Sequence, residues 1–276
     1  MSASIDLSPG RSGLSRVLIA ARRQNRPDGP VPSLNNQTAV ITGSSSGYGL
    51  ACAKLLPGLG VSHLILGVRS IKRGEEAIKQ LRKDNVNITF EVWELDMLSY
   101  DSVRNFAQRL KSLHRLDLAI LNAGVVKLDF AKSPEPYSHE ETIKVNYLST
   151  ALLTILLLPI LKPKNALAPP GRLTIVGSST AVGSDFEHRA ADPLLPALDR
   201  EWAGAFAGSE QYAVSKLLVM MFVFKLSQLV SPDHVIINNV CPGLSNDTNL
   251  SRQAKGVLKL VAMGMQKAYG RTTEQG

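Results

Sequence analysis

Tyr212 and Lys216 stand four residues apart in a segment, residues 211–230, whose composition predicts a helix. Residues at this spacing share one face of a helix, so the phenol and the ammonium would point the same way. A free tyrosine has a pKa of about 10, and a nearby ammonium lowers it. The pair therefore indicates acid–base work by Tyr212, although most tyrosine–lysine pairs at this spacing lie on ordinary helix surfaces.

Two further polar residues occupy positions that suit a reaction site. Ser178 ends a predicted strand that begins at residue 172, where its hydroxyl can hydrogen-bond a substrate oxygen. Asn146 lies in the middle of an apolar helix predicted over residues 140–161, where a polar amide needs a structural or functional reason. With Tyr212 and Lys216, these residues form a candidate catalytic set.

The scaffold that must position this set is predicted from apolar segments that alternate with helical patterns after residue 37. Apolar strands separated by helices are typical of a parallel sheet covered on both faces. With right-handed crossovers, such a chain forms a single-domain α/β fold with a doubly wound, Rossmann-like sheet. The predicted strands are residues 38–42, 63–68, 88–95, 116–121, 172–176 and 234–240, and the predicted helices are 50–59, 71–83, 99–113, 140–161 and 211–230.

The first strand runs into a glycine-rich turn, TGSSSGYG over residues 42–49. Glycines permit a tight turn and let backbone N–H groups approach a pyrophosphate, and the next helix presents its N-terminus to that charge. A glycine-rich turn alone is weak support for a nucleotide site. Its place between the first strand and the first helix of a βαβ unit favours a dinucleotide.

The end of the second strand bears on which dinucleotide is bound. NAD enzymes usually place an acid there for the ribose 2′-hydroxyl, whereas this chain has Arg69 and no acid before Glu75. A guanidinium pairs with a 2′-phosphate through a planar fork, and a carboxylate would repel it. The sequence therefore favours NADP(H), with a solvated arginine at a helix start as the alternative explanation of Arg69.

In combination, these motifs resemble the short-chain dehydrogenase/reductase family, of the single-domain type. The matching segments are TGxxxGxG at 42–49, Leu95-Asp96, Asn122-Ala123-Gly124, Asn146, Ser178, YAVSK at 212–216 and Pro242-Gly243. The resemblance covers about residues 37–270 and looks most like fungal, retinol-dehydrogenase-like members. It implies an NADP-dependent oxidoreductase that interconverts a carbonyl and its alcohol.

The resemblance also implies roles for the catalytic set. Tyr212 would give a proton to the carbonyl oxygen in reduction and take it back in oxidation. Lys216 would hold the nicotinamide ribose and lower the pKa of Tyr212. Ser178, with Ser179 as the neighbouring alternative, would hold and polarise the substrate oxygen, and Asn146 would hold a water of the proton relay.

The remaining matches are implied to bind the cofactor. Asp96 would touch the adenine, the turn at Asn122 and Gly124 would pack on the cofactor, and Pro242-Gly243 would lie beside the nicotinamide. The family often has Ser or Thr four residues past this glycine, where Asp247 stands here, so Thr248 would make that contact. The cofactor set is Gly43, Ser46, Gly47, Tyr48, Gly49, Arg69, Asp96, Asn122, Gly124, Tyr212, Lys216, Pro242, Gly243 and Thr248.

The family usually continues through one more helix and strand than this chain contains. We therefore expect a domain over residues 37–276 that is short at its C-terminal end, after a basic, flexible leader over residues 1–36. This leaves a second hypothesis open, a truncated or non-catalytic nucleotide-binding member of the same family. A third, weaker alternative is a scaffolding dimer partner.

Charge and composition restrict the partners. The net charge is +8, but residues 1–36 hold five Arg against two Asp and residues 250–276 hold five cations against one Glu, so the body is nearly neutral. That distribution argues against nucleic acid, whose binders usually carry the basic stripe on the folded domain. Two cysteines favour a reducing, cytoplasmic location, with a weak mitochondrial possibility in the leader.

The most apolar run, residues 151–161, is too short for a membrane span, so we expect no transmembrane segment. The helix from residue 217 to 229 is apolar on more than one face. With its counterpart at 147–161 it predicts a homodimer or homotetramer, since the family packs these helices between subunits. No His/Cys spacing suggests a metal.

The substrate is expected to be a lipophilic ketone, aldehyde or alcohol, with a role in secondary metabolism. The apolar residues that support this expectation lie between Ser178 and Tyr212 and after Pro242. They are Phe186, Leu194, Leu195, Trp202, Phe206, Val257, Leu258, Leu260 and Met263. Each of them could equally pack its own loop.

Overall fold

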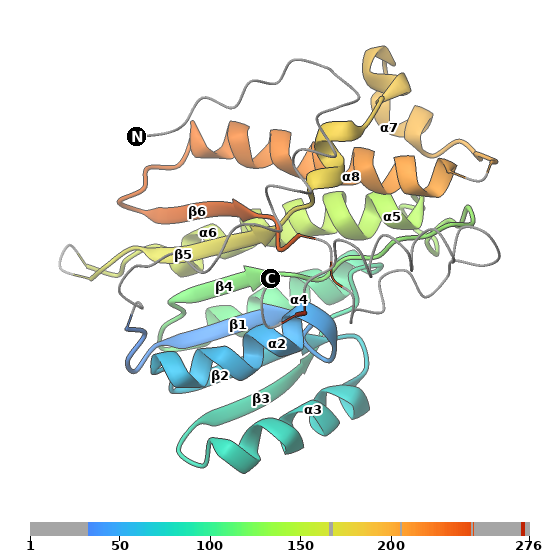
Figure 1. Cartoon of the computed structure of the whole chain (residues 1–276). Coiled ribbons are helices and arrows are strands. Elements are labelled where there is room, and N and C mark those ends of the chain that lie inside the picture. Colours follow the sequence, from blue (N-terminus) through green and yellow to red (C-terminus); the bar gives the residue numbers. More distant parts are fainter. Residues whose placement is uncertain (1–32, 166–167, 205, 244, 246–271, 274–276) are drawn as a thin grey trace.

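A six-stranded parallel sheet forms the centre of the computed structural model, which describes residues 33–165, 168–204, 206–243, 245 and 272–273 (Figure 1). The strand order is β3-β2-β1-β4-β5-β6, the order of a doubly wound Rossmann-like sheet. The predicted fold class is therefore confirmed. The strands are β1 (Thr38–Thr42), β2 (His63–Val68), β3 (Thr89–Glu94), β4 (Leu118–Leu121), β5 (Gly171–Val176) and β6 (Val235–Val240).

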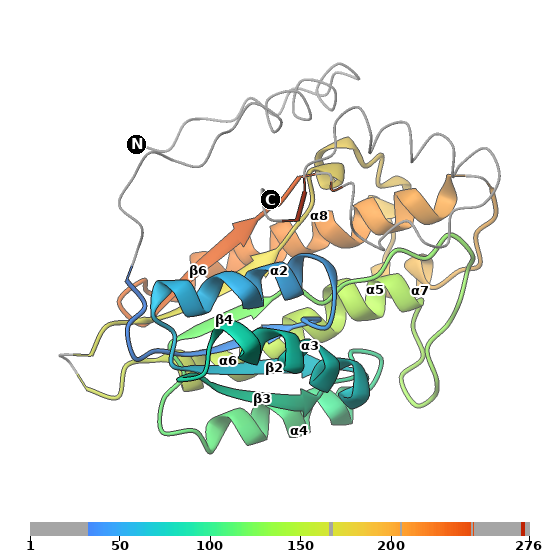
Figure 2. The same cartoon turned by 60° about the horizontal axis from the view of Figure 1, so that its bottom comes forward.

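Helices cover both faces of this sheet, as the views in Figures 1 and 2 show. Right-handed crossovers place α2 and α3 on one face and α4, α6 and α8 on the other. The helices are α2 (Gly47–Leu55), η1 (Leu56–Leu59), α3 (Ile71–Asp84), α4 (Tyr100–Lys111), α5 (Glu141–Ile143), η2 (Lys144–Ser149), α6 (Thr150–Leu161), η3 (Ser179–Gly183), η4 (Glu187–Ala190), α7 (Leu194–Leu198) and α8 (Ala207–Ser227).

Alternate residues of each strand supply two separate cores. In β1, Val40 belongs to the core under α4, α6 and α8, whereas Ala39 and Ile41 belong to the core under α2 and α3. Successive strand side chains point to opposite faces, so a strand buried on both sides must be apolar throughout. All five residues of β1 are buried, which is why the sequence shows a continuous apolar run there.

Three predicted elements differ from the structure in ways that have a physical cause. The helix predicted over residues 50–59 is divided after Leu55, where the 3₁₀ turn η1, which contains Pro57, follows α2. The helix predicted over 140–161 is continuous but contains a π-helical segment, η2, at Asn146. Helix α8 begins four residues before the predicted start at residue 211, because its first turn packs through Gly208 on the chain at Lys127.

The helical stretch Glu141–Leu161 has the length and composition of a membrane span, with a mean hydropathy of 1.7 in its most apolar window. Half of that window is buried inside the fold, and Leu153, Leu157 and Leu161 pack in the core on β5. Core helices of folded domains share this composition. We therefore assign the stretch to the core.

Candidate active site

A cleft of about 350 Å³ opens at the carboxyl ends of β1, β2, β3 and β4. The strand order reverses between β1 and β4, which is where doubly wound sheets bind ligands. Four strand ends that are separated in the sequence thus meet around one space. Of the predicted cofactor residues, the cleft is lined by Gly43, Ser46, Gly47, Tyr48, Arg69, Asp96, Asn122 and Gly124.

The glycine-rich turn between β1 and α2 has no room for side chains. Gly43 and Gly47 have φ values of +67° and +57°, in the region that favours glycine. A Cβ atom on Gly49 would lie 2.5 Å from the Gly43 carbonyl oxygen and 2.6 Å from Asn122 Nδ2. The turn therefore brings bare backbone and the N-terminus of α2 to the cleft, a geometry that suits a pyrophosphate.

Asn122 ties this turn to the end of β4. Its Nδ2 donates to the carbonyl oxygens of Thr42 at 3.0 Å and Gly43 at 3.2 Å. Thr42 Oγ1 in turn accepts from the Ala123 backbone N–H at 3.0 Å. These bonds hold the two loops at the switch point together, so the predicted packing role of Asn122 includes fixing the glycine turn.

Two arginines reach the cleft from the β2 end. Arg69 is exposed beside Ser70, whose hydroxyl caps α3 by accepting from the Arg73 N–H. Arg73 also lines the cleft. Arg73 was not among the predicted cofactor residues, although its place four residues past Arg69 was a usable signal. Carboxylates in the lining come from Asp96 and from Glu141, and the latter is paired with Lys127 at 2.5 Å.

The structure brings Tyr212, Lys216 and Ser178 together at the end of β5. Lys216 Nζ donates to the Val176 carbonyl oxygen at 2.8 Å and lies 5.8 Å from the centre of the Tyr212 ring. A Cβ atom on Gly124 would be 3.5 Å from the same Nζ, so the ammonium also faces the cleft wall. Ser178 lies two residues beyond the end of β5, at the carboxyl edge of the sheet, where it caps η3.

Burial sets the pKa values of this pair. Burial raises the pKa of Tyr212 to about 12, against a smaller lowering by a hydrogen bond with the Ser178 side chain. Burial lowers the pKa of Lys216 to about 8, and Cys241 opposes this shift weakly. The predicted lowering of the Tyr212 pKa by Lys216 is therefore wrong for this arrangement. The reason is that burial disfavours the phenolate, while Lys216 Nζ donates its hydrogen bond to Val176 O.

The hydroxyl of Ser178 is held from two sides. Its Oγ accepts from Thr180 Oγ1 at 2.9 Å and from the Thr180 N–H at 3.3 Å. The neighbouring Ser179 gives its N–H to Cys241 Sγ at 3.1 Å. With both lone pairs engaged, the Ser178 hydroxyl hydrogen is free to point at Tyr212 or at a substrate oxygen.

Asn146 joins the cleft wall to the catalytic helix. Its Oδ1 accepts from the Val125 N–H at 2.8 Å, and its Nδ2 donates to Val125 O at 2.9 Å and to Ser215 Oγ at 3.0 Å. Ser215 lies between Tyr212 and Lys216 on α8. The buried amide that seemed unexplained in an apolar helix thus positions α8 against the loop after β4.

A buried carboxylate that contacts Gln211, the residue before Tyr212, was not predicted from the sequence. Glu140 is fully buried, and its Oε2 accepts from the Ile143 N–H at 2.9 Å and from Gln211 Nε2 at 3.3 Å. Its backbone N–H donates to Asp199, which also binds His139 at 2.7 Å. These residues come from three separate segments, so no local pattern could have identified the network. The sequence pointed only to Glu140 itself, as a Glu beside an apolar run.

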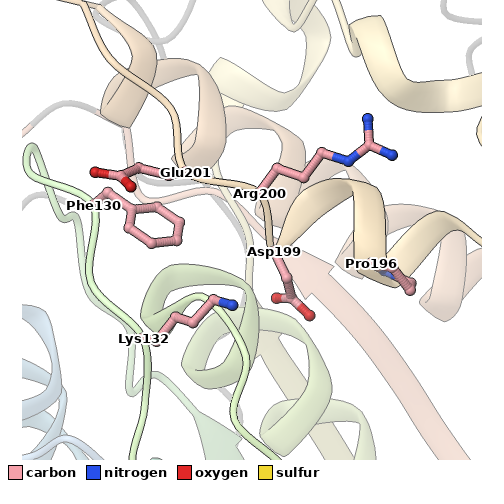
Figure 3. Close-up of a pocket in the computed structure, with 6 residues that line it drawn as sticks. All are labelled: Phe130, Lys132, Pro196, Asp199, Arg200 and Glu201. Atoms are coloured by element: carbon pink, nitrogen blue, oxygen red, sulfur yellow. The ribbon is translucent and has the colours of Figure 1, made fainter.

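Asp199 also lines an open pocket of about 690 Å³ with Phe130, Lys132, Pro196, Arg200 and Glu201 (Figure 3). In Figure 3 one side of this pocket comes from the loop before α5 and the other from α7 and the segment after it. Trp202, one of the predicted substrate-lining residues, contacts Phe130 edge to face.

Three other predicted lining residues, Phe186, Leu194 and Leu195, pack in a core cluster with α8 instead. Phe206 is exposed at the start of α8.

The loop after β6 reaches the glycine turn through Tyr48. Its Oη contacts the carbonyl oxygens of Pro242 at 3.5 Å and Gly243 at 3.4 Å. The predicted pair Pro242-Gly243 therefore lies near the cleft. Thr248 and the predicted lining residues after 256 lie outside the described residues. Among the described residues, no three of His, Cys, Asp and Glu gather as a metal-binding group.

Comparison with known proteins identifies the family. The profile of the family described as short chain dehydrogenase matches residues 37–188, more than half of the chain. The short chain dehydrogenase opdN of Penicillium oxalicum is 43% identical over 254 residues, which cover 88% of this chain and 81% of the relative. The short chain dehydrogenase/reductase mfmJ of Annulohypoxylon moriforme is 41% identical, covering 92% of this chain and 74% of the relative.

Solved structures show the same fold at lower identity. A short-chain dehydrogenase from Sphingobium yanoikuyae, solved with NADPH, has a TM-score of 0.63 and 20% identity and covers 84% of this chain and 82% of its own. Salutaridine reductase from Papaver somniferum has a TM-score of 0.60 and 22% identity, and the match covers 87% of this chain and 92% of the reductase. With the fold, the glycine turn and the Tyr212–Lys216 pair in place, these matches show that the chain belongs to the short-chain dehydrogenase/reductase family of oxidoreductases.

Proposed function

We propose that this protein is an NADP(H)-dependent oxidoreductase that interconverts a lipophilic carbonyl compound and its alcohol. The observation that carries the proposal is the hydrogen-bonded pair of Tyr212 and Ser178 beside buried Lys216, at the edge of a cleft with a nucleotide-type glycine turn. A module that only bound a nucleotide would not need the hydrogen-bonded pair of Tyr212 and Ser178 beside Lys216. We therefore favour the enzyme over a non-catalytic member.

The residues divide the reduction into binding and proton transfer. A nicotinamide cofactor held at the glycine turn and Arg69 would supply a hydride to the carbonyl carbon, and the π electrons would move to oxygen. Ser178 donates a hydrogen bond to that oxygen, and Tyr212 gives it the phenol proton. With a pKa of about 12, Tyr212 is protonated at neutral pH and ready to act as an acid. Oxidation runs in reverse, with Tyr212 as the base.

Two features of the predicted cofactor site fit NADP(H). The bare turn at Gly43, Gly47 and Gly49 admits a pyrophosphate, and Arg69 and Arg73 offer two cations where a 2′-phosphate would lie. Two proteins of similar fold were solved with this cofactor, the dehydrogenase from Sphingobium yanoikuyae with NADPH and RhlG of Pseudomonas aeruginosa with NADP. They support the choice of NADP(H).

A cofactor titration tests this choice. We expect wild type to bind NADPH more tightly than NADH, and Arg69→Ala to lose about tenfold or more in NADPH affinity because a charge-assisted pair is gone. Affinity for NADH should stay the same, and exposed Arg82→Ala on α3 should behave as wild type. Equal binding of the two cofactors by wild type would refute the NADP assignment.

The finer points of the proposal rest on the sequence. They are a homodimer or homotetramer, a cytoplasmic location, a role in secondary metabolism, and the division into a leader over residues 1–36 and a domain from residue 37. The exposed apolar residues Met221 and Phe224 on α8 support an oligomer. A monodisperse monomer in light scattering would refute it.

A further inference from the structure

A carboxylate in the first turn of α8 is bonded to the loop that follows Ser178. Glu210 Oε1 accepts hydrogen bonds from Ser184 Oγ at 2.7 Å and from the Phe186 N–H at 3.1 Å. The same N–H lies 3.2 Å from Ser184 Oγ, so the three groups form a closed network. An acid in the first turn of a helix is common because it complements the helix dipole, but that role requires no bond to another segment. The contact with this loop therefore needs a separate explanation.

Phe186 adopts a backbone conformation that needs support from its surroundings. Its φ of +41° lies in the left-handed region, which a phenylalanine rarely adopts. Such a conformation persists where neighbouring structure over-determines it. Here the side chain is buried in a cluster with Val214 and Leu218 of α8, and Glu210 fixes the N–H. Packing and the carboxylate together hold this part of the loop to the helix that carries Tyr212.

The turn η3 connects this contact to Ser178. Ser178 is the N-cap of η3 and Ser184 is its C-cap. At its start, the Ser179 N–H donates to Cys241 Sγ at 3.1 Å, which ties η3 to the chain just after β6. The end of η3 is held by the bond from Ser184 to Glu210. Because η3 has only five residues, a displacement at one end reaches the other.

We propose that Glu210 is a positioning residue that fixes η3, and with it the Ser178 hydroxyl, relative to Tyr212. Glu210 and Tyr212 belong to the same helix, so the carboxylate sets the separation of the two hydroxyls that would share the carbonyl oxygen. A displacement of about 1 Å in such a group can cost about a hundredfold in rate. The inference rests on the proposed function, because a shared carbonyl oxygen is what makes this separation matter.

Two substitutions separate the hydrogen bonds of Glu210 from its charge. Glu210→Ala removes the acceptor, and we expect kcat/KM for a carbonyl compound to fall about tenfold or more while the Kd for NADPH is unchanged. Glu210→Gln keeps an oxygen for Ser184 and Phe186 and should stay within about threefold of wild type, since neutral bonds are weaker than charge-assisted ones. Glu187→Ala, which removes an exposed carboxylate beside Phe186, is the matched control and should equal wild type.

Amide hydrogen exchange tests the geometry without any substrate. The N–H groups of Thr180, Ala181 and Phe186 are hydrogen-bonded when η3 is held as described. In peptides that span residues 179–186, we expect exchange about tenfold faster or more in Glu210→Ala and close to the wild-type rate in Glu210→Gln. Thermal unfolding establishes that the rest of each variant is folded.

Four results would overturn the proposal. They are wild-type exchange in Glu210→Ala, faster exchange without a loss of kcat/KM, equal impairment of the glutamine and alanine variants, and a matching loss of NADPH affinity. The third would mean that charge and not hydrogen bonding is responsible, and the fourth that the cofactor site is disturbed as well. If wild type reduces no carbonyl compound, the proposed function fails, and the exchange rates still decide whether Glu210 holds η3.

Discussion

Tyr212 and Lys216 share a buried environment that moves their pKa values in opposite directions. Burial raises the pKa of the phenol to about 12 and lowers that of the ammonium to about 8, since in each case it disfavours the charged form. The spacing of the two residues was readable from the sequence, but the sign of the shift on Tyr212 was not. It depends on the depth of α8 and on Val176, which takes the lysine's hydrogen bond.

Lys216 should therefore limit activity on the alkaline side. Its pKa of about 8 means that it is charged below that pH and loses its proton above it, so the proposed contact with the cofactor ribose would weaken as the pH rises. We expect kcat/KM for carbonyl reduction to fall through about pH 8. Lys216→Arg, which stays charged, should move this fall to higher pH. A pH profile identical to that of wild type in the arginine variant would contradict this role.

Glu140 should stabilise the contact between α5 and the first turns of α8 chiefly in its protonated form. Burial raises its pKa, while hydrogen bonds with Thr142, Ile143 and Gln211 partly oppose that. A carboxyl whose folded pKa lies above its unfolded value stabilises the fold below the unfolded pKa and loses that stability as the pH rises through the folded pKa.

Substitutions separate the hydrogen bonds of Glu140 from its charge. Glu140→Gln keeps an acceptor for Ile143 and Gln211 and removes the charge, so its stability relative to wild type should improve as the pH rises. Glu140→Ala leaves two donors unpaired and should cost about 1–3 kcal/mol. Urea unfolding at an acidic and a neutral pH measures the stability of both variants, with Glu187→Ala at an exposed position as the control. An alanine variant as stable as wild type would contradict the role of the network.

At the scale of elements, the strands were the most predictable part. The residues of β1 and β2 match their predicted ranges because strands buried on both faces leave continuous apolar runs. Helix ends were less predictable. The start of α8 depends on Gly208, which packs on the backbone at Lys127, eighty-one positions earlier in the chain. No local sequence pattern records such a contact.

Gly208 should consequently resist substitution. A Cβ atom there would lie 2.3 Å from the Lys127 carbonyl oxygen and 2.8 Å from Leu128 Cα, and backbone cannot move aside cheaply. We expect Gly208→Ala to lose about 1–3 kcal/mol of stability and to lower kcat by displacing Tyr212 one turn later. Gly58→Ala, where nothing lies within 4 Å, should be neutral or slightly stabilising in the same thermal and kinetic assays. Equal behaviour of the two variants would show that the contact at Lys127 is not needed.

At the scale of the molecule, the sheet order explains why distant motifs form one site. The reversal between β1 and β4 opens the cleft, and β5 carries Ser178 to the same edge. The doubly wound fold and the residues at the strand ends followed from the sequence. The Glu140 network and the contact of Glu210 with the loop after Ser178 did not, because both combine segments whose meeting depends on tertiary packing.

In the proposed reaction, a hydride passes from NADPH to a carbonyl carbon while Tyr212 supplies the proton. The most direct measurement incubates the protein with NADPH deuterated at C4, on either face, and a panel of lipophilic ketones and aldehydes. Mass spectrometry then follows label in the alcohols. We predict that wild type transfers deuterium from one face of the cofactor and that Tyr212→Phe binds NADPH with unchanged affinity but forms no labelled alcohol. NADPH binding by wild type without transfer of label from either face, or equal transfer by Tyr212→Phe, would contradict the account.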